Sequence, residues 1–539
     1  MKKITLLLVF LVSLTAWSQD DAWVYFNAKS NEQVYYDSPL SMLSQRALDR
    51  RFKQNIALDF KDIPINPSYI SQVKSVDGIT VLAKSKWLNA LHIRGSVSTI
   101  NSLKSFGFVS NVHFADKSLN ITAKSVNTSK SKIESKISNS RVNFAYGTSD
   151  NQIKMLKGDA LHQQNYTGSG LIIAVLDAGF PGVNTVQPFQ RLRDNNKILG
   201  GYDFVTRNAN FYAGNNHGTY VLSSMGGYKE NALVGTAPDA SYYLFITEDN
   251  SQENPVEESY WVEAAEKADS LGVDIINTSL GYLGDHTNPA YNHTYEDMTG
   301  DATFISKGAN IAFSRGMIVV ASAGNDGTES EPHIGSPADA FSVLAVGAVT
   351  ANGSKASFSS IGPSYDGRVK PDVMAQGQST VLSDENGNII AASGTSFSGP
   401  IMAGMVACLW QAFPNKSNQE IKDMIVNSAD KFSTPSPQYG YGIPDFNLAL
   451  GLQFPDMEED VMGAIHLNPN PTASLVKVSF PQSVQGVNVV FYSVSGNKVL
   501  DYKNIVSDAP ISLESLESGT YIYKLEFNSS IKTGKIIKL

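Results

Sequence analysis

Four polar residues lie directly beside apolar segments in the central part of the chain, and their side chains are of the kinds that hydrolyse acyl groups. Asp177 follows the apolar run 171–176, and His217 precedes a glycine and a mostly apolar stretch. Asn325 follows another apolar run, and Ser396 lies within the sequence Gly-Thr-Ser-Phe-Ser-Gly-Pro. A serine hydroxyl becomes an effective nucleophile when an adjacent base takes its proton and a third group orients that base. A side-chain amide can donate a hydrogen bond to the oxyanion that forms in such a reaction.

Each of these residues also has an ordinary structural interpretation when it is taken alone. Asp177 and Asn325 suit turns, His217 suits a helix end or a core, and Ser396 suits a helix cap. Gly218 favours a functional role for His217, because glycine lets the backbone approach closely and a buried helix after it can fix the ring. The four residues in the order Asp, His, Asn, Ser form a more specific signal than any one of them.

Short apolar strands alternating with helices must position these residues. Between about 145 and 450 this alternation predicts a parallel sheet covered by helices on both faces. Sites in such folds are built at the carboxyl ends of the strands. A helix through 405–413 has Pro400 in its predicted first turn, which places Ser396 near the helix N-terminus. The predicted strands are 171–176, 242–245, 273–277, 317–321 and 343–346, and the other predicted helices are 257–271 and 304–315.

The regions on either side have different patterns. Residues 23–115 contain both strand and helix patterns, which predicts a small α+β domain. One of the strands is expected at 34–36 and one of the helices over 40–52. Residues 117–140 hold seven serines, five lysines and one acid, as expected of a linker or an exposed, cleavable segment. Residues 463–539 contain strand patterns separated by turn signals, which predicts a small β-sandwich.

The first residues and the composition narrow the class of protein. Two lysines, an apolar stretch over 4–16 and small residues at 16 and 18 predict a secretory signal peptide at 1–18. A membrane anchor is the alternative, but the apolar stretch is shorter than the ~20 residues that a spanning helix needs. The 539 residues carry a net charge of −9, which argues against nucleic-acid binding. Cys408 is the single cysteine, so no internal disulfide can form.

Over roughly 145–450 these segments resemble the subtilisin-like serine proteases, the subtilase or S8 family. The resemblance rests on the four segments above and on three others. These are Gly-Thr-Ala-Pro at 235–238, Asn-Thr-Ser-Leu-Gly at 277–281 and Tyr-Gly-Tyr-Gly at 439–442. The resemblance implies a subtilisin-like α/β fold with a parallel sheet covered by helices on both faces.

The resemblance also implies a role for each of the four polar residues. Ser396 would attack the scissile carbonyl, His217 would take and return the proton, and Asp177 would orient His217. Asn325 and the backbone N–H of Ser396 would hold the oxyanion. Ala178, Phe397 and Ser398 depart from the usual family sequence without removing a catalytic group, and this puts substrate preference and local packing in question.

A substrate-binding channel between two segments is implied in the same way. One segment would pair with the substrate backbone, and the other would form the opposite wall of the pocket for the P1 side chain, which precedes the scissile bond. Asp326 follows Asn325 and suggests a slight preference for a basic P1 residue. The predicted substrate-binding residues are Ser279, Leu280, Gly281, Ser322, Ala323 and Gly324.

The flanking domains have counterparts in precursor proteases. The N-terminal domain lies where subtilases keep an inhibitory propeptide, with an unrelated binding domain as the alternative. The C-terminal region resembles the sorting domain of the Bacteroidetes type IX secretion system, through Leu-Asn-Pro-Asn-Pro at 467–471 and Tyr-Ser-Val-Ser-Gly-Asn-Lys-Val at 492–499. A carbohydrate- or surface-binding β-sandwich is the alternative there. The predicted domains are signal peptide 1–18, propeptide 19–116, linker 117–144, catalytic domain 145–455 and sorting domain 463–539.

The resulting prediction is a secreted serine endopeptidase made as a precursor with an inhibitory propeptide. Its expected partners are protein or peptide substrates, its own propeptide and the secretion machinery, with no nucleic acid, transmembrane anchor, cofactor or metal. Oxygen-rich side chains in 284–301 leave structural calcium open, but their spacing is not diagnostic. An inactive surface scaffold is disfavoured by the intact set of four residues. An α/β-hydrolase esterase is disfavoured by the missing Gly-x-Ser-x-Gly.

Charge is divided unevenly between the two parts of this precursor. Residues 19–140 carry 16 basic and 10 acidic side chains, whereas residues 141–462 carry 17 basic and 36 acidic side chains. Opposite net charge would assist docking of the propeptide on the protease before cleavage.

Overall fold

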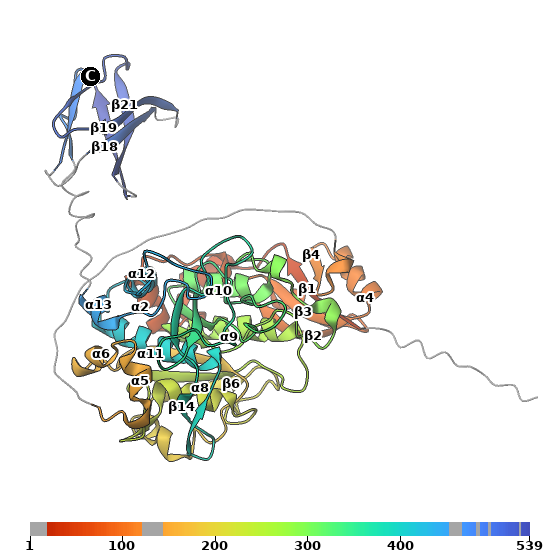
Figure 1. The fold of residues 1–539 in the computed structure, drawn as a ribbon. Coiled ribbons are helices and arrows are strands. Elements are labelled where there is room, and N and C mark those ends of the chain that lie inside the picture. Colours follow the sequence, from red (N-terminus) through yellow and green to blue (C-terminus); the bar gives the residue numbers. More distant parts are fainter. Residues whose placement is uncertain (1–18, 121–143, 452–465, 481–485, 494–496, 528–529) are drawn as a thin grey trace, which may run out of the picture. The chain divides into compact units, whose positions relative to one another are not determined.

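The computed structural model describes residues 19–120, 144–451, 466–480, 486–493, 497–527 and 530–539. The predicted signal peptide lies outside these residues, as do most of the predicted linker and the first residues of the predicted C-terminal domain. The chain forms two compact units, 1–450 and 451–539, whose elements are labelled in Figure 1. Across the described residues, none of the helices combines the length and apolar character needed to cross a membrane.

A seven-stranded parallel sheet forms the centre of the larger unit, as predicted. Its strands lie in the order β13-β12-β11-β10-β5-β9-β6, and neighbouring strands run parallel. Successive residues of a strand point to opposite faces. Ile173 and Val175 therefore join one buried apolar cluster, while Ala174 and Leu176 join another. The strands are β5 (Ile172–Asp177), β6 (Ile198–Asp203), β9 (Ser241–Ile246), β10 (Ile275–Thr278), β11 (Ile318–Ser322), β12 (Leu344–Val349) and β13 (Val373–Gln376).

Helices cover both faces of the sheet, which confirms the predicted α/β architecture. On one face, the first buried cluster includes residues of α8 (His217–Gly226), α11 (Thr395–Ala412) and α12 (Asn418–Asn427). On the other face, the second cluster includes α9 (Val256–Leu271) and α10 (Phe304–Ser314). The shorter elements of this domain are α5 (Asp150–Lys154), α6 (Asp159–Gln163), α7 (Gln190–Asp194), α13 (Phe446–Gly451) and the strand pairs β7 (Tyr228–Lys229) with β8 (Leu233–Val234) and β14 (Thr380–Ser383) with β15 (Ile389–Ala392).

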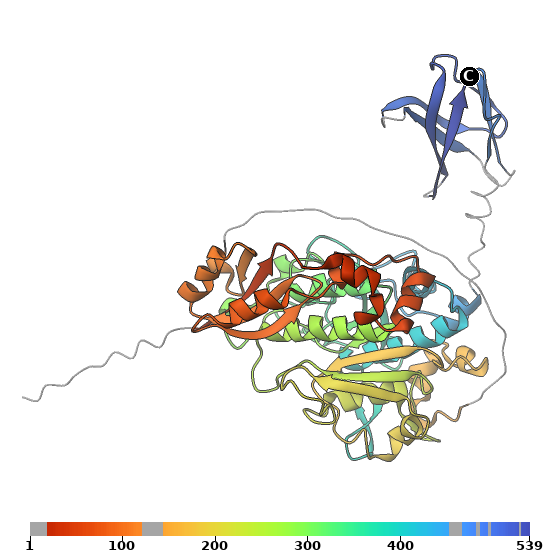
Figure 2. The ribbon, with the colours of Figure 1, turned by 180° about the vertical axis from the view of Figure 1, so that it is seen from behind.

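The N-terminal domain, residues 19–120, is an α+β domain, as predicted. Its antiparallel sheet has the order β2-β3-β1-β4. Trp23 and Trp87 of this domain join the buried cluster of α9 and α10, so the domain packs on those helices (Figure 2, red to orange against green). Its elements are β1 (Asp20–Phe26), α1 (Glu32–Asp37), α2 (Gln45–Lys53), α3 (Pro67–Lys74), β2 (Thr80–Ser85), β3 (Ala90–Gly95), α4 (Val97–Ser102) and β4 (Val109–Phe114).

Two details of this domain differ from the sequence prediction. The strand predicted at 34–36 is wrong, because these residues lie in helix α1. Val-Tyr-Tyr favours a strand locally, but none of the described strands pairs with this segment and none of its residues is buried. The helix predicted over 40–52 begins later, since Ser44 caps α2 by accepting a hydrogen bond from the Ala47 N–H.

The smaller unit contains two antiparallel sheets that share one apolar cluster, in agreement with the predicted β-sandwich. The sheets have the orders β16-β17-β20 and β19-β18-β21-β22. Val476 and Phe491, one from each sheet, are fully buried between them. The strands are β16 (His466–Asn468), β17 (Leu475–Ser479), β18 (Val487–Ser493), β19 (Lys498–Ile505), β20 (Pro510–Ser512), β21 (Gly519–Phe527) and β22 (Ser530–Lys538).

Candidate active site

Three neighbouring strands of the central sheet end at the same edge and bring the predicted site residues there. β10 lies between β5 and β11, and Thr278 at its end pairs in register with Leu176 on one side and Ala321 on the other. Asp177 is the last residue of β5, Ser279 follows β10, and β11 runs into Ala323. Parallel strands have their carboxyl ends on one side, so residues about 100 positions apart in the sequence meet there.

The Asp177 carboxylate and the His217 ring form one hydrogen-bonded pair. Asp177 Oδ1 lies 2.7 Å from His217 Nδ1 and also accepts the Ala178 N–H at 2.8 Å, and Asp177 is 2% exposed. His217 is the first residue of α8, and its own N–H donates to the Asn215 side chain. Burial lowers the pKa of His217, but the charge and hydrogen bond of Asp177, with a contribution from Glu248, raise it above its usual value.

Gly218 allows α8 to begin this close to β5. A Cβ at this position would lie 2.4 Å from the Gly179 carbonyl oxygen and 3.0 Å from the Asp177 Cβ. The sequence prediction that a glycine here permits close backbone approach is confirmed.

Replacing Gly218 by alanine should therefore displace the start of α8 and the His217 ring with it. We expect kcat to fall about 100-fold, since a misplacement of about 1 Å has that cost, and the unfolding free energy to fall by about 1–3 kcal/mol from overpacking. Steady-state kinetics and thermal unfolding measure both. Gly284→Ala is the matched control, because nothing lies within 4 Å of that added Cβ. Equal effects of the two substitutions would contradict this account.

Ser396 lies in the first turn of α11, and two reciprocal hydrogen bonds join it to Ser279. The Ser396 hydroxyl donates to the Ser279 carbonyl oxygen at 3.2 Å, and the Ser279 hydroxyl donates to the Ser396 carbonyl oxygen at 3.0 Å. His217 lies nearby, with its ring 6.0 Å from the ring of Phe397. Among the described contacts no hydrogen bond joins Ser396 to His217, and such bonds are often long before substrate binds.

Pro400 lies further along α11 than the sequence predicted. The helix begins at Thr395, so Pro400 is its sixth residue and falls in the second turn. Proline has no N–H to donate to the carbonyl four residues earlier, which here is that of Ser396. The Ser279 hydroxyl takes the place of that missing donor.

Asn325 is fixed by its side-chain oxygen. Asn325 Oδ1 accepts the Thr395 N–H at 2.9 Å and the Thr395 hydroxyl at 3.1 Å. Because the Asn325 side-chain oxygen is bound to Thr395, the amide NH₂ group points away from Thr395, where it can donate a hydrogen bond. Thr395, to which the sequence reasoning gave no role although it lies within the serine motif, therefore positions the amide of Asn325.

A cavity of about 240 Å³ adjoins Ser396 and Asn325. All six predicted substrate-binding residues line it: Ser279, Leu280, Gly281, Ser322, Ala323 and Gly324. Tyr282, Asp285 and Asp326 line it as well. Asp285 belongs to the insert 284–301, and the sequence carries no signal that this insert contributes to the cavity.

The polar side chains of the insert 284–301 make contacts within the insert and with neighbouring parts of the chain. Asn292 accepts the His286 N–H and donates to the Gly284 carbonyl oxygen, and Asp297 pairs with Lys117. Among the described residues, one group of three acids converges elsewhere, at Glu248, Glu253 and Glu257. Burial and mutual repulsion raise the pKa of Glu248 and Glu257, and both already accept hydrogen bonds from protein groups. The expectation that no metal is required stays a prediction.

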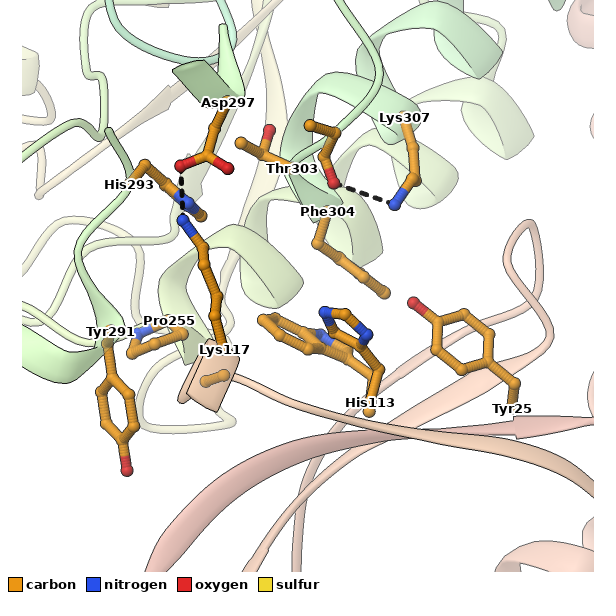
Figure 3. A pocket seen from close by; sticks show the side chains of 13 residues that line it. Tyr25, His113, Lys117, Pro255, Tyr291, His293, Asp297, Thr303, Phe304 and Lys307 are labelled. Carbon is orange, nitrogen blue, oxygen red and sulfur yellow. Dashed lines mark hydrogen bonds and ion pairs between the residues drawn. The ribbon is translucent and has the colours of Figure 1, made fainter. Parts of the chain in front are cut away.

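The N-terminal domain packs tightly on α9 and α10. Trp23 stacks on Phe304 with 5.2 Å between ring centroids, and its indole N–H donates to the Ser259 hydroxyl. Figure 3 shows the pocket between the two domains, where Lys117 forms an ion pair with Asp297.

A second set of contacts joins α2 to the C-terminal end of α9. Arg50 and Arg51 both donate to Asp269, and all three side chains are almost completely buried. Arg51 also pairs with Asp62 of its own domain at 2.7 Å. Burial raises the pKa of Asp269, but the charges of Arg51 and Arg50 hold it below its usual value. Opposite charges thus meet across this interface, as the uneven charge distribution suggested.

Comparisons with known families agree with this arrangement. The model of the subtilase family matches residues 168–442, about half of the chain. The model of the peptidase S8 propeptide domain of Bacteroidota matches residues 21–134, which argues against an unrelated N-terminal binding domain. The model of the secretion system C-terminal sorting domain matches residues 466–539, and such a domain indicates secretion. The predicted domain boundaries stay predictions.

Individual relatives are subtilisins. Subtilisin NAT of Bacillus subtilis subsp. natto is 32% identical over 294 residues, which are 54% of this chain and 68% of that protein. Subtilisin of Bacillus pumilus is 32% identical over 294 residues, 54% of this chain and 94% of that protein. Subtilisin Savinase of Lederbergia lenta is 30% identical over 295 residues, 54% of this chain and 94% of that protein. The chain therefore belongs to the subtilase family, as a serine endopeptidase with an S8 propeptide domain and a C-terminal secretion sorting domain.

Proposed function

We propose that this protease hydrolyses peptide bonds through an acyl-enzyme on Ser396, with His217 as the base and Asp177 as the group that orients it. The observation that carries the proposal is the buried Asp177 carboxylate 2.7 Å from His217 Nδ1, at the sheet edge where the cavity beside Ser396 opens. An Nδ1–H held by Asp177 leaves the Nε2 lone pair available to accept a proton.

The reaction then proceeds in two halves. The Ser396 hydroxyl turns from the Ser279 carbonyl toward His217, and Oγ bonds to the scissile carbonyl carbon while its proton passes to His217 Nε2. The Asn325 amide and the Ser396 N–H stabilise the resulting oxyanion. His217 gives the proton to the leaving amine as the C–N bond breaks. Water then attacks the acyl ester, with His217 taking its proton and returning it to Ser396 Oγ.

Labelling with a fluorophosphonate, together with casein cleavage, tests this proposal on wild-type protein and on Ser396→Ala. We expect the wild type to be labelled at Ser396, located by mass spectrometry, and to cleave casein, whereas Ser396→Ala does neither. Absence of labelling in correctly processed wild type would overturn the catalytic role and favour an inactive scaffold. Ester turnover without casein cleavage would favour an esterase.

The proposal includes an inhibitory role for the propeptide domain, which docks on the protease through α9 and α10. Its buried contacts of Arg50 and Arg51 with Asp269 support tight docking, because removing one partner of a buried pair typically costs about 3–5 kcal/mol. Exposed pairs contribute much less, about 0–1 kcal/mol.

Asp269→Asn in the uncut Ser396→Ala precursor should therefore lower the unfolding free energy by about 3–5 kcal/mol. Asp297→Asn is the matched control: its partner Lys117 is 42% exposed, and the expected loss is about 1 kcal/mol or less. Urea unfolding followed by tryptophan fluorescence measures both. Because the pKa of Asp269 is lowered in the folded state, its contribution should be present at neutral pH and lost as acid protonates the carboxylate. Equal losses in the two variants would show that the buried cluster does not hold the domains together.

A further inference from the structure

A second cavity lies between the propeptide and protease domains, and its lining side chains are drawn in Figure 3. This interdomain cavity is lined mainly by β1 and β4 on one side and by α10 and the insert 284–301 on the other, and it shares no lining residue with the cavity beside Ser396. Its volume is about 50 Å³. One water needs about 10–15 Å³ of such space, so about four waters or one small ion fit.

Basic side chains outnumber acidic ones in the lining of the interdomain cavity. The basic residues that line it are His113, Lys117, His293 and Lys307. Asp297 is the one acid among its described lining residues, and it is already bonded, because it pairs with Lys117 and accepts the Thr294 N–H. An anion in this cavity would therefore meet basic groups rather than a free carboxylate.

Lys307 reaches the cavity from α10 and has no ion-pair partner among the described contacts. Its ammonium donates to the Ala302 carbonyl oxygen at 2.9 Å, which uses one of its three N–H donors. Burial lowers the pKa of Lys307, and the charges of Asp301 and Glu258 offset only part of that effect. A bound anion would supply the missing counter-charge and accept a second hydrogen bond.

His113 reaches the same space from β4. It pairs in register with Trp23 of β1, with 6.2 Å between the ring centroids, and the described contacts give it no hydrogen bond. Partial removal from water lowers the pKa of His113, and the charges of Lys307 and Lys117 lower it further. The two lysines are thus close enough for their charges to act on His113, and an anion between these groups would relieve the repulsion.

His293 has a ring nitrogen that no described residue contacts by a hydrogen bond. Its side chain is 10% exposed, and its Nε2 lies 2.7 Å from Glu258 Oε1, whereas its Nδ1 is buried without a partner. Burial raises the pKa of Glu258, but the charge and hydrogen bond of His293 hold it below its usual value, so this carboxylate is ionised. Beside an ionised carboxylate the ring can carry both protons, and its Nδ1–H then needs an acceptor.

We propose that the interdomain cavity binds one small tetrahedral oxyanion, of the phosphate or sulfate class, through Lys307 and His293 of the protease domain and His113 of the propeptide domain. These donors come from different elements around the cavity. The four oxygens of a tetrahedral anion point in four directions and can accept from all of them. A carboxylate has both oxygens on one side and would leave the donors of the opposite wall unsatisfied.

The bound anion strengthens docking of the propeptide domain. Because His113 belongs to one domain and Lys307 and His293 belong to the other, the complete site exists only while the two domains are docked. A ligand that binds one state in preference to another stabilises that state. Anion binding and domain docking therefore reinforce each other.

Isothermal titration calorimetry on the uncut Ser396→Ala precursor tests binding, with sodium phosphate and sodium sulfate as probes and sodium chloride keeping the ionic strength constant. We expect one anion per chain. Lys307→Met and His113→Phe should each raise the dissociation constant about tenfold or more, because each removes a donor and keeps a side chain of similar size. Lys154→Met is the matched control: Lys154 is 52% exposed on α5 and does not line the cavity, so the dissociation constant should stay within about twofold.

Thermal unfolding of the same proteins tests the link to docking. At about 100 times its dissociation constant, phosphate should raise the Tm of the precursor by about 2–4 °C, but not that of Lys307→Met or of processed enzyme without its propeptide domain. An equal rise with sodium chloride at the same ionic strength, or unchanged phosphate affinity in Lys307→Met and His113→Phe, would overturn the inference. His113→Phe acts from the propeptide side, so it keeps the test decisive if Lys307→Met fails to fold. The measurements on the uncut precursor do not depend on the catalytic role of Ser396.

Discussion

Asp177→Ala should lower kcat about 10⁴-fold, the largest loss that we expect from any residue acting on His217 rather than on the substrate. The substitution removes the only acceptor that the described contacts give to His217 Nδ1, so the ring loses both its orientation and the charge that stabilises the imidazolium. KM should change little, because Asp177 does not line the substrate cavity. A loss below about tenfold would show that this carboxylate does not support catalysis.

Asp177→Asn separates orientation from charge. Asp177 Oδ1 accepts both the Ala178 N–H and the His217 Nδ1–H, while Oδ2 is buried without a hydrogen-bond partner among the described residues. An asparagine that keeps its oxygen in the Oδ1 position would hold the same His217 tautomer but leave its amide nitrogen unsatisfied. We therefore expect Asp177→Asn to retain more activity than Asp177→Ala. Equal activities would mean that the amide reverses and donates to Nδ1.

The pH dependence gives an independent measurement on the same pair. In the wild type the Asp177 charge outweighs burial and raises the pKa of His217 above its usual value. Because the base must be neutral, kcat/KM should rise as pH increases through that pKa. Without the charge, burial acts on His217 with little opposition and lowers its pKa. The ascending limb of the residual activity should therefore move to lower pH in both variants. If the ascending limb does not move, the pH dependence of kcat/KM reflects the ionisation of a group other than His217.

More of the candidate active site could be predicted from the sequence than of the ion pairs that join the N-terminal domain to α9. Asp177 and Asn325 could be placed at one edge because apolar runs mark parallel strands, and such strands end there. The substrate-binding segments were implied by the family resemblance. The ion pairs of Arg50 and Arg51 with Asp269 were not predictable, because they join positions 219 and 218 residues apart and each residue alone looks like an ordinary surface charge.

Local pattern also failed where tertiary contacts decide the outcome. Pro400 usually marks a first turn, but here α11 begins five residues earlier, at Thr395, and the Ser279 hydroxyl donates to the Ser396 carbonyl oxygen that proline cannot serve. Val-Tyr-Tyr at 34–36 has strand propensity, yet it lies outside the sheet order of its domain and forms a helix. In the first case the partner, Ser279, lies far away in the sequence. In the second case none of the described strands pairs with the segment.

Asn325→Ala should lower kcat about 10²- to 10³-fold with little change in KM, because the amide donates to an oxyanion that exists only during the reaction. Thr395→Val tests how that amide is positioned. Valine keeps the shape of threonine and the backbone N–H at 2.9 Å from Asn325 Oδ1, but removes the hydroxyl at 3.1 Å. Losing one neutral hydrogen bond of about 1 kcal/mol should cost about tenfold or less in kcat.

The double variant Asn325→Ala with Thr395→Val shows whether the two residues act as one unit. If Thr395 works through the Asn325 amide, removing its hydroxyl should cost nothing further once the amide is gone, so the double variant should match Asn325→Ala alone. Multiplied losses would mean that the Thr395 hydroxyl acts by another route. Its contact with the Gly324 N–H, at 3.3 Å, would be the first candidate, since Gly324 forms a wall of the substrate cavity. In that case KM for substrates with a large P1 side chain should rise, which a loss confined to the oxyanion would not cause.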